Sequence, residues 1–200
     1  MTPPSHPIDE VQVDRARELA SIGAGHAANA LAAMLGRPCT MRVPTVRLLS
    51  ADRVQAPYVA GDTAGHDRMG VFFELDGGPG GVVALLFPGE VRDRLIDSLL
   101  GDRGSDPEIA ESALRELGNI LVSHVASSIA DTIGDSVVPS IPVLAMKDAG
   151  SALASLLAPR ATQGGALRIE TEIADERREI RGLLVFMPDD VEAPTDPHPA

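Results

Sequence analysis

The chain has 200 residues, of which 44% are hydrophobic, and its formal net charge is −12. This length suits one domain or two fused half-domains that share a core, and the acidic balance argues against nucleic acid, whose phosphates require basic side chains. A single cysteine, Cys39, excludes an internal disulfide and a cysteine-based metal site, and no apolar run approaches the length of a membrane span. We therefore expect a cytoplasmic protein that binds neither nucleic acid nor a membrane.

The two ends of the chain differ in composition from its middle. Residues 1–8 form a Pro-rich leader and residues 189–200 an acidic, Pro-rich tail, and we expect both to be disordered. Residues 9–188 are predicted to form one domain that consists of two half-repeats, at about 9–100 and 107–188.

Hydrophobic periodicity predicts two long helices. The first spans about residues 8–35 and stops at Gly36; the second spans about 108–133, with Pro107 at its start and Gly134 at its end. The other predicted elements are, in chain order, a strand at 39–50 that Pro44 interrupts, strands at 68–75 and 81–87, a short amphipathic helix at 90–100, a strand at 137–145, a short helix or loop at 150–157, and strands at 167–172 and 180–187.

A polar stripe runs along the second long helix. At about 100° per residue, Ser112, Glu116, Asn119 and Ser123 fall within about 60° of one another. Glu116 and Asn119 lie one turn apart, so a single partner group or water molecule could meet both side chains. Taken alone, this spacing is typical of an ordinary solvated helix face. The apolar side chains fall on the opposite side of the helix, at Leu114, Leu117, Leu121 and Val125.

The same pattern occurs 98 residues earlier in the chain. The matching positions are Asp14 and Ser112, Glu18 and Glu116, Ser21 and Asn119, His26 and His124, and Pro44 and Pro142. The apolar run at 69–75 also matches 167–173, and 85–88 matches 183–186 with a slip of about one residue. A period this long indicates two similar half-domains and excludes an array of short repeats.

Each half therefore supplies a long helix, a strand and a hairpin. Together the halves predict an α+β fold with a sheet of about six strands and two long helices on one face, which leaves the polar stripe outward. We expect Gly23 and Gly118 to permit close backbone packing. His26 and His124, at matching positions about 80° from the stripe, are predicted to have a core or inter-helix role.

The spacing of the motif resembles the signature of a known family. Ser112, Glu116 and Asn119, followed after 22 residues by Pro142, resemble the signature of the CheC, CheX and FliY phosphatases of chemotaxis. The segments 116–120 (ELGNI) and 21–25 (SIGAG) resemble the two corresponding helices of CheC. The two-copy layout favours CheC over CheX, and the resemblance implies pseudo-two-fold symmetry between the halves.

The resemblance also implies a reaction. Its substrate would be the aspartyl phosphate of a phosphorylated CheY-type receiver, which brings its own Mg²⁺, so that this chain would need no metal or cofactor of its own. An acyl phosphate is labile, and hydrolysis requires chiefly that a water molecule be placed in line with the phosphorus. Asn119 is the candidate for placing that water, because a carboxamide donates and accepts hydrogen bonds without carrying charge. Glu116 is assigned to docking, through a receiver Lys or Arg.

The first copy departs from the signature. Asp14 and Glu18 are kept, but Ser21 stands where the family has Asn, and a hydroxyl is shorter than a carboxamide and has one donor. We therefore predict one working site, with the first copy weak or inactive. Pro44 and Pro142 are predicted to bend the strand after each long helix. Ser112 fits either a part of the motif or a small exposed residue.

Two further functions stay open. CheC proteins also bind the receptor deamidase CheD, so this chain could serve as a non-catalytic adaptor that senses the phosphorylated receiver. A structural role in the flagellar switch, as in FliY and FliM relatives, is disfavoured because no terminal extension resembles a receiver-docking peptide or a rotor-binding domain.

Overall fold

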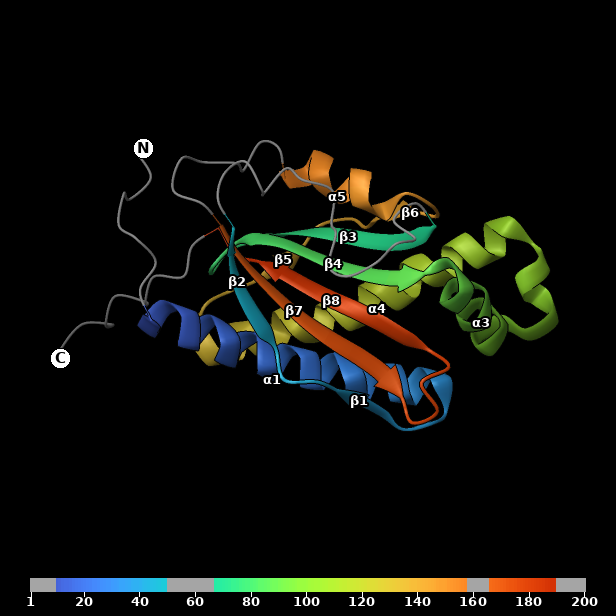
Figure 1. Ribbon diagram of the computed structural model, residues 1–200, viewed down its shortest axis with the longest axis horizontal. Helices are drawn as coiled ribbons and strands as arrows, with labels where there is room; N and C mark the ends of the chain where they lie inside the picture. The colour runs from blue at the N-terminus through green and yellow to red at the C-terminus, as the bar shows by residue number, and fades with distance from the viewer. Residues whose placement is uncertain (1–9, 50–66, 158–165, 190–200) are drawn as a thin grey trace.

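The computed structural model describes residues 10–49, 67–157 and 166–189. This part of the chain folds into a curled antiparallel sheet with four α-helices (Figure 1). The helices are α1 (Glu10–Leu35), α3 (Gly89–Leu100), α4 (Pro107–Ile133) and α5 (Ala149–Leu157), and a short 3-10 helix, η1 (Gly101–Ser105), joins α3 to α4. The strands are β1 (Cys39–Met41), β2 (Thr45–Leu49), β3 (Arg68–Asp76), β4 (Gly81–Pro88), β5 (Val138–Pro139), β6 (Val143–Ala145), β7 (Ala166–Asp175) and β8 (Arg181–Met187). The predicted α+β class is confirmed. The predicted leader, and the predicted tail apart from Asp189, lie outside the described residues.

Local sequence signals set both ends of α4. The Asp106 side chain accepts a hydrogen bond from the backbone N–H of Glu108 at 2.9 Å, and Pro107 occupies the first turn, where a missing N–H has no cost. At the other end, Gly134 adopts a left-handed conformation with φ of 70° and donates its N–H to the Ala130 carbonyl. Helix α4 therefore begins one residue before the predicted 108–133 and ends with it. Helix α1 begins two residues after the predicted 8–35 and ends with it.

The two long helices cover one face of the sheet, as predicted (Figure 1). The apolar side chains opposite Glu116 are buried in a core that α1, α4 and the sheet share, and Leu114, Leu117 and Leu121 are fully inaccessible to solvent. The short helix α5 covers part of the other face, where Leu153 and Leu157 pack with Phe72 and Leu86 in a second, smaller core. Apolar burial on both faces holds the layers together.

The sheet has six strand positions, which also agrees with the prediction. Its order is β1-β7-β8-β4-β3-β5, with β2 continuing β1 along β7 and β6 continuing β5 along β3. Each outer position is thus one strand broken in two, and the residue directly before the second piece is Pro44 at one edge and Pro142 at the other. A proline cannot donate to a ladder, so edge positions are where a sheet tolerates it.

The pairing register supports the duplication residue by residue. Met41 pairs with Ile173 and Thr45 with Glu170, so that four steps along the outer strand oppose three along β7. The positions 98 residues away behave identically: Pro139 pairs with Leu75, and Val143 pairs with Phe72. Both edges therefore carry the same one-residue bulge.

The halves exchange their outer strands. The broken strand that follows α1 pairs with the second hairpin, β7 and β8, whereas the broken strand that follows α4 pairs with the first hairpin, β3 and β4. Neither half completes its sheet without the other, so we describe the two halves as one interlocked domain.

Two sequence predictions are wrong in detail. The last strand was expected to be offset by about one residue from the 98-residue period. In the structure Glu74 pairs with Val82, so an exact repeat would pair the equivalent Glu172 with residue 180. Glu172 pairs with Leu183 instead, so the offset is three residues. The second hairpin is longer, because β7 and β8 extend further before the chain turns. His26 and His124 were expected to face the core or the other helix, but both are exposed. The solvent-facing side of each helix is therefore wider than the polar stripe alone.

Candidate functional site

The predicted stripe on α4 faces solvent. Ser112, Glu116 and Ser123 are exposed and Asn119 is partly exposed. Within the described residues, neither the Glu116 carboxylate nor the Asn119 carboxamide forms an ion pair or a side-chain hydrogen bond. Because these groups lie one helical turn apart and are not engaged inside the protein, both remain available to a group that approaches from solvent.

The turn that carries Glu116 and Asn119 is pressed against the sheet. Gly118 lies between them, and a Cβ atom built at Gly118 would stand 2.6 Å from Cγ1 of Val71 and 3.3 Å from Cε2 of Phe73, both on β3. No side chain fits there, so α4 approaches β3 more closely than an alanine would allow. Gly23 of α1 likewise lies against α4, where a Cβ atom built at Gly23 would stand 3.0 Å from Cγ1 of Val125. The predicted role of both glycines in close packing is confirmed.

Pro142 is connected to the same helix through Arg115. The Arg115 guanidinium donates to the Pro142 carbonyl at 3.4 Å and lies 3.5 Å from the Glu111 carboxylate one turn back on α4. Arg115 directly precedes Glu116, so this contact holds the bulged edge of the sheet beside the polar stripe. The four residues of the signature thus belong to one region, with Ser112, Glu116 and Asn119 on α4 and Pro142 on the adjoining edge.

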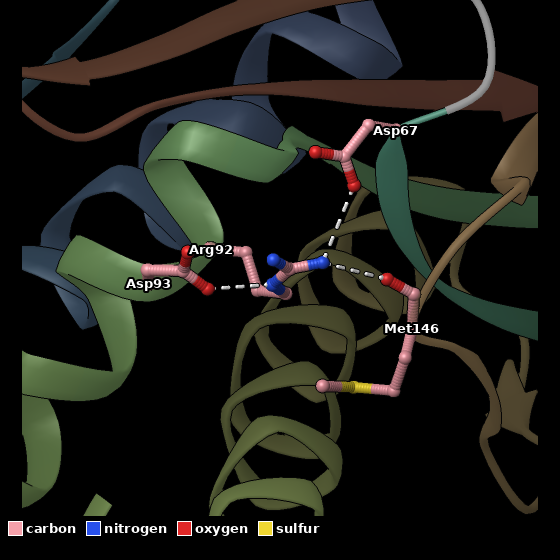
Figure 2. A network of polar contacts seen from close by, with 4 residues as sticks. All are labelled: Asp67, Arg92, Asp93 and Met146. Carbon is pink, nitrogen blue, oxygen red and sulfur yellow. Dashed lines mark hydrogen bonds and ion pairs between the residues drawn. The ribbon is translucent and has the colours of Figure 1, made fainter.

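Arg92 fixes the other end of this edge (Figure 2). From α3, its guanidinium donates to the Met146 carbonyl at 3.2 Å, to the Asp67 carboxylate at 3.4 Å and to the Asp93 carboxylate at 2.8 Å. The hydrogen bond to Asp93, which outweighs partial burial, raises the pKa of Arg92, so the group stays charged. The segment from Pro142 to Met146 is therefore attached to α4 at its start and to α3 at its end.

The matching stripe on α1 is exposed but is arranged differently. Asp14 and Glu18 are exposed and Ser21 is partly exposed. Arg17, at the position equivalent to Arg115, forms an ion pair with Asp14. Glu18 forms no ion pair within the described residues, like Glu116. Pro44 is buried, whereas Pro142 is partly exposed.

Other titratable groups do not converge on the stripe. In the part of the chain that the structure describes, no three His, Cys, Asp or Glu side chains come together as metal ligands. Cys39 lies beside Arg37 and Asp175, where burial and then the Asp175 carboxylate raise the pKa of its thiol. No helix among the described residues is sufficiently long and apolar to cross a membrane.

Sequence reasoning missed Arg115 and Arg92. The duplication offered a signal for Arg115, because an arginine precedes the glutamate of the motif in both halves, as Arg17 and Arg115. Arg92 had no such signal. Its acceptor is the backbone carbonyl of Met146, directly after β6 and 54 residues away, and a carbonyl leaves no trace in the sequence.

Comparisons with known proteins relate this chain to one family. The sequence model of the CheC-like family matches residues 109–145, the segment from the first turn of α4 to the end of β6. The chain is 30% identical over 191 residues to the CheY-P phosphatase CheC of Bacillus subtilis, an alignment that covers 91% of this chain and 90% of the relative. It is 24% identical to the putative CheY-P phosphatase CheC1 of Halobacterium salinarum, covering 91% and 92% of the two chains.

Solved structures share the fold. FliY of Thermotoga maritima superposes with a TM-score of 0.65 at 20% identity, over 90% of each chain. CheX in the CheX-CheY-BeF3-Mg²⁺ complex from Borrelia burgdorferi superposes with a TM-score of 0.57 at 13% identity, over 86% of this chain and 99% of that one. The identity to the Bacillus relative over nearly the whole of both chains, together with the signature on α4, shows that this chain belongs to the CheC-like family.

Proposed function

We propose that this chain hydrolyses the aspartyl phosphate of a CheY-type receiver and so ends a chemotaxis signal in the cytoplasm. The observation that carries the proposal is that Glu116 and Asn119 lie one turn apart on a solvent-facing side of α4, and that neither side chain forms an ion pair or a side-chain hydrogen bond with another described residue. An exposed face suits a substrate that is itself a protein, because a phosphoryl group on another domain cannot enter a closed pocket. The name of the Bacillus relative, CheY-P phosphatase, supports this choice of substrate.

Asn119 would position the attacking water. An acyl phosphate needs no covalent intermediate with the catalyst, so the main requirement is a water molecule held in line with the phosphorus. The Asn119 carboxamide can accept a hydrogen bond from that water and donate one to a phosphoryl oxygen, and it brings no negative charge to repel the phosphoryl group. Gly118 favours this task, because close contact with β3 leaves the helix turn little freedom to shift.

Glu116 would dock the receiver. A carboxylate repels a phosphoryl group but attracts a lysine or arginine beside it, and Glu116 has no partner among the described residues that would have to be displaced. The receiver would supply the Mg²⁺ that neutralises the phosphoryl oxygens. The likeness to the fold in the CheX-CheY-BeF3-Mg²⁺ complex supports a CheY-type receiver as the partner.

Hydrolysis and binding can be separated by one substitution. Asn119→Ala removes the carboxamide from a partly exposed position without burying or exposing the core, so the fold should persist. We expect the rate of phosphate release from a phosphorylated receiver to fall about 100-fold. Ser123→Ala, one turn further along the same stripe, is the matched control and should keep the wild-type rate. Equal rates for Asn119→Ala and the wild type would contradict the proposed catalysis.

An adaptor role is the second candidate. It is favoured by Ser21, because a half that lacks the carboxamide keeps an exposed acidic stripe that could still bind. In this account the chain would bind the phosphorylated receiver or CheD without hydrolysing phosphate. The similarity to FliY and to FliM middle domains is below 25% identity, so it supports the shared fold and gives no separate reason to propose a flagellar switch component.

A further inference from the structure

The arginine that precedes the motif glutamate has different partners in the two halves. Arg17 forms an ion pair with Asp14, three residues before it on α1. Arg115 instead lies 3.5 Å from the Glu111 carboxylate and donates to the Pro142 carbonyl at 3.4 Å. The two arginine side chains are equally exposed, at 43% and 42%, so burial does not select between these partners. The selection must come from the neighbouring side chains.

Two neighbouring positions account for the difference. Three residues before the arginine, the first half has Asp14 and the second half has Ser112. Four residues before the arginine, the first half has Val13 and the second half has Glu111. A carboxylate at either spacing can pair with an arginine on the same helix. Each half therefore offers its arginine one acid, at a different position.

The position of that acid decides the direction of the arginine side chain. At about 100° per residue, Glu111 lies about 100° from Ser112 and only about 20° from Gly118, the residue that is pressed against β3. Glu111 therefore draws the Arg115 guanidinium away from the polar stripe and towards the edge of the sheet. The acid of the first half lies within the stripe of α1 and keeps its arginine there.

The carbonyl that Arg115 reaches belongs to an exposed bulge of the outer strand. Pro142 is partly exposed, whereas its counterpart Pro44 is buried, so the second edge depends more on polar contacts. Ile141, directly before Pro142, is exposed at 88%. Because Arg115 directly precedes Glu116 on α4, the contact holds a large apolar side chain beside the polar stripe. Apolar side chains bordered by charged groups are the usual composition of a contact between two proteins.

We propose that Arg115 is a positioning residue of the α4 site, which holds the bulge at Pro142 so that a bound receiver contacts Ile141. Ser112 gives Arg115 this role, because a serine offers no carboxylate that would keep the arginine on its own helix. The inference rests on the proposed function, since it takes a CheY-type receiver to be the protein that Glu116 docks. Arg115 would touch neither the phosphoryl group nor the attacking water, so its loss should weaken docking and leave the hydrolytic step nearly unchanged.

Docking and hydrolysis are measured separately. The binding probe is a CheY-type receiver activated with beryllium fluoride and Mg²⁺, titrated calorimetrically against the full chain, and the kinetic measurement is phosphate release from the phosphorylated receiver. For Arg115→Ala we expect Kd and KM to rise about fivefold, while kcat stays within about twofold of the wild type. Arg115→Lys keeps a donor at this position and should restore most of the lost affinity. Ile141→Ala should raise Kd by a similar factor, and adding it to Arg115→Ala should raise Kd little further.

Ser112→Asp tests the choice of partner. A carboxylate three residues before Arg115 would compete with the Pro142 carbonyl for the guanidinium, and we expect Kd to rise about threefold. In the Arg115→Ala background the same substitution should leave Kd unchanged, because no guanidinium remains to be captured. Equal weakening in both backgrounds would overturn the inference, since the added charge itself would then be the cause.

A control variant separates docking from a general loss of charge. Arg94→Ala removes an exposed arginine from α3 and should bind the receiver as tightly as the wild type. Thermal unfolding of each variant shows whether the fold is intact at the assay temperature. Wild-type affinity of Arg115→Ala, or a fall in its kcat without a change in Kd, would overturn the inference and leave hydrolysis by Asn119 intact. The expected losses of affinity together with full activity of Asn119→Ala would instead keep the docking contact and remove the proposed catalysis.

Discussion

The two halves of the chain share their long helices and the register of their outer strands, and they differ in chemistry at the motif. Their outer strands pair in the same register around the same bulge, and each long helix presents a glutamate that has no ion pair among the described residues. At the motif, however, the position of Asn119 is occupied by Ser21 in the first half, and the position of Gly118 is occupied by Ala20. Backbone register depends on many residues at once, whereas the proposed catalysis depends on one carboxamide. A single substitution at that position would therefore remove the proposed catalysis and leave the register unchanged.

The edge strands show the same contrast. Arg115 reaches the Pro142 carbonyl, whereas its counterpart Arg17 pairs with Asp14 on its own helix. Arg92 adds an attachment at Met146, the residue that directly follows β6. The half that keeps the carboxamide is therefore also the half whose proline edge is attached to two helices, as a positioning mechanism requires.

The largest expected effect concerns Glu116. In Glu116→Lys a cation would meet the cation of the receiver, and we expect kcat/KM for phosphate release to fall about 100-fold, mostly through KM. Asp131→Lys makes the same change in charge about four turns further along α4 and serves as the control. If both variants lose activity equally, net charge and not docking explains the effect.

Gly118→Ala should have the next largest effect. The added Cβ would meet Val71 at 2.6 Å, and we expect overpacking to lower the free energy of unfolding by about 2 kcal/mol, despite the better helix propensity of alanine. At Gly25 the nearest atom to a Cβ is the Met41 sulfur at 3.9 Å, so Gly25→Ala should cost nothing or stabilise by up to about 1 kcal/mol. Denaturant unfolding of both variants measures the difference. A neutral Gly118→Ala would show that α4 is not held tightly on β3.

Ser21→Asn sharpens the comparison directly. Introduced into Asn119→Ala, it gives the first half the carboxamide that the second half has lost, and we expect phosphate release to recover by about tenfold, equivalent to about 1.4 kcal/mol. Recovery should be incomplete, because Ala20 stands where the second half has Gly118, and Arg17 pairs with Asp14 on its own helix instead of reaching the outer strand. No recovery at all would mean that the first half lacks more than one residue.

Arg92→Ala should have the smallest of these effects. It removes a partly buried guanidinium that joins α3 to the segment after Pro142, and we expect the free energy of unfolding to fall by about 1 kcal/mol. Arg94→Ala, an exposed arginine two residues along the same helix, should change it by less than about 0.5 kcal/mol. Thermal unfolding would reveal equal losses if the charge of α3, and not the attachment at Met146, were responsible.

Local signals explain why much of this fold was predictable. Asp106, Pro107 and Gly134 define α4 through contacts within a few residues, and the 98-residue period carries that information from one half to the other. The stripe was predictable for the same reason, because helical spacing alone puts Glu116 and Asn119 together.

Long-range choices explain what was missed. Nothing in residues 39–49 specifies that this strand pairs with the hairpin of the other half, since both hairpins offer similar edges. The exposure of His26 and His124 depends on how α1 and α4 pack against each other and the sheet, which an angle on a single helix cannot give. The attachment by Arg92 uses a carbonyl acceptor, for which every residue type is equivalent.

The central claim is that the later half works because of one carboxamide. The most direct test compares the lifetime of a phosphorylated receiver in the presence of Asn119→Ala and of Ser21→Ala, at equal protein concentration. We predict that Asn119→Ala slows dephosphorylation about 100-fold and that Ser21→Ala stays within about twofold of the wild type. Equal lifetimes with the two variants would contradict the claim, because the two faces would then contribute alike.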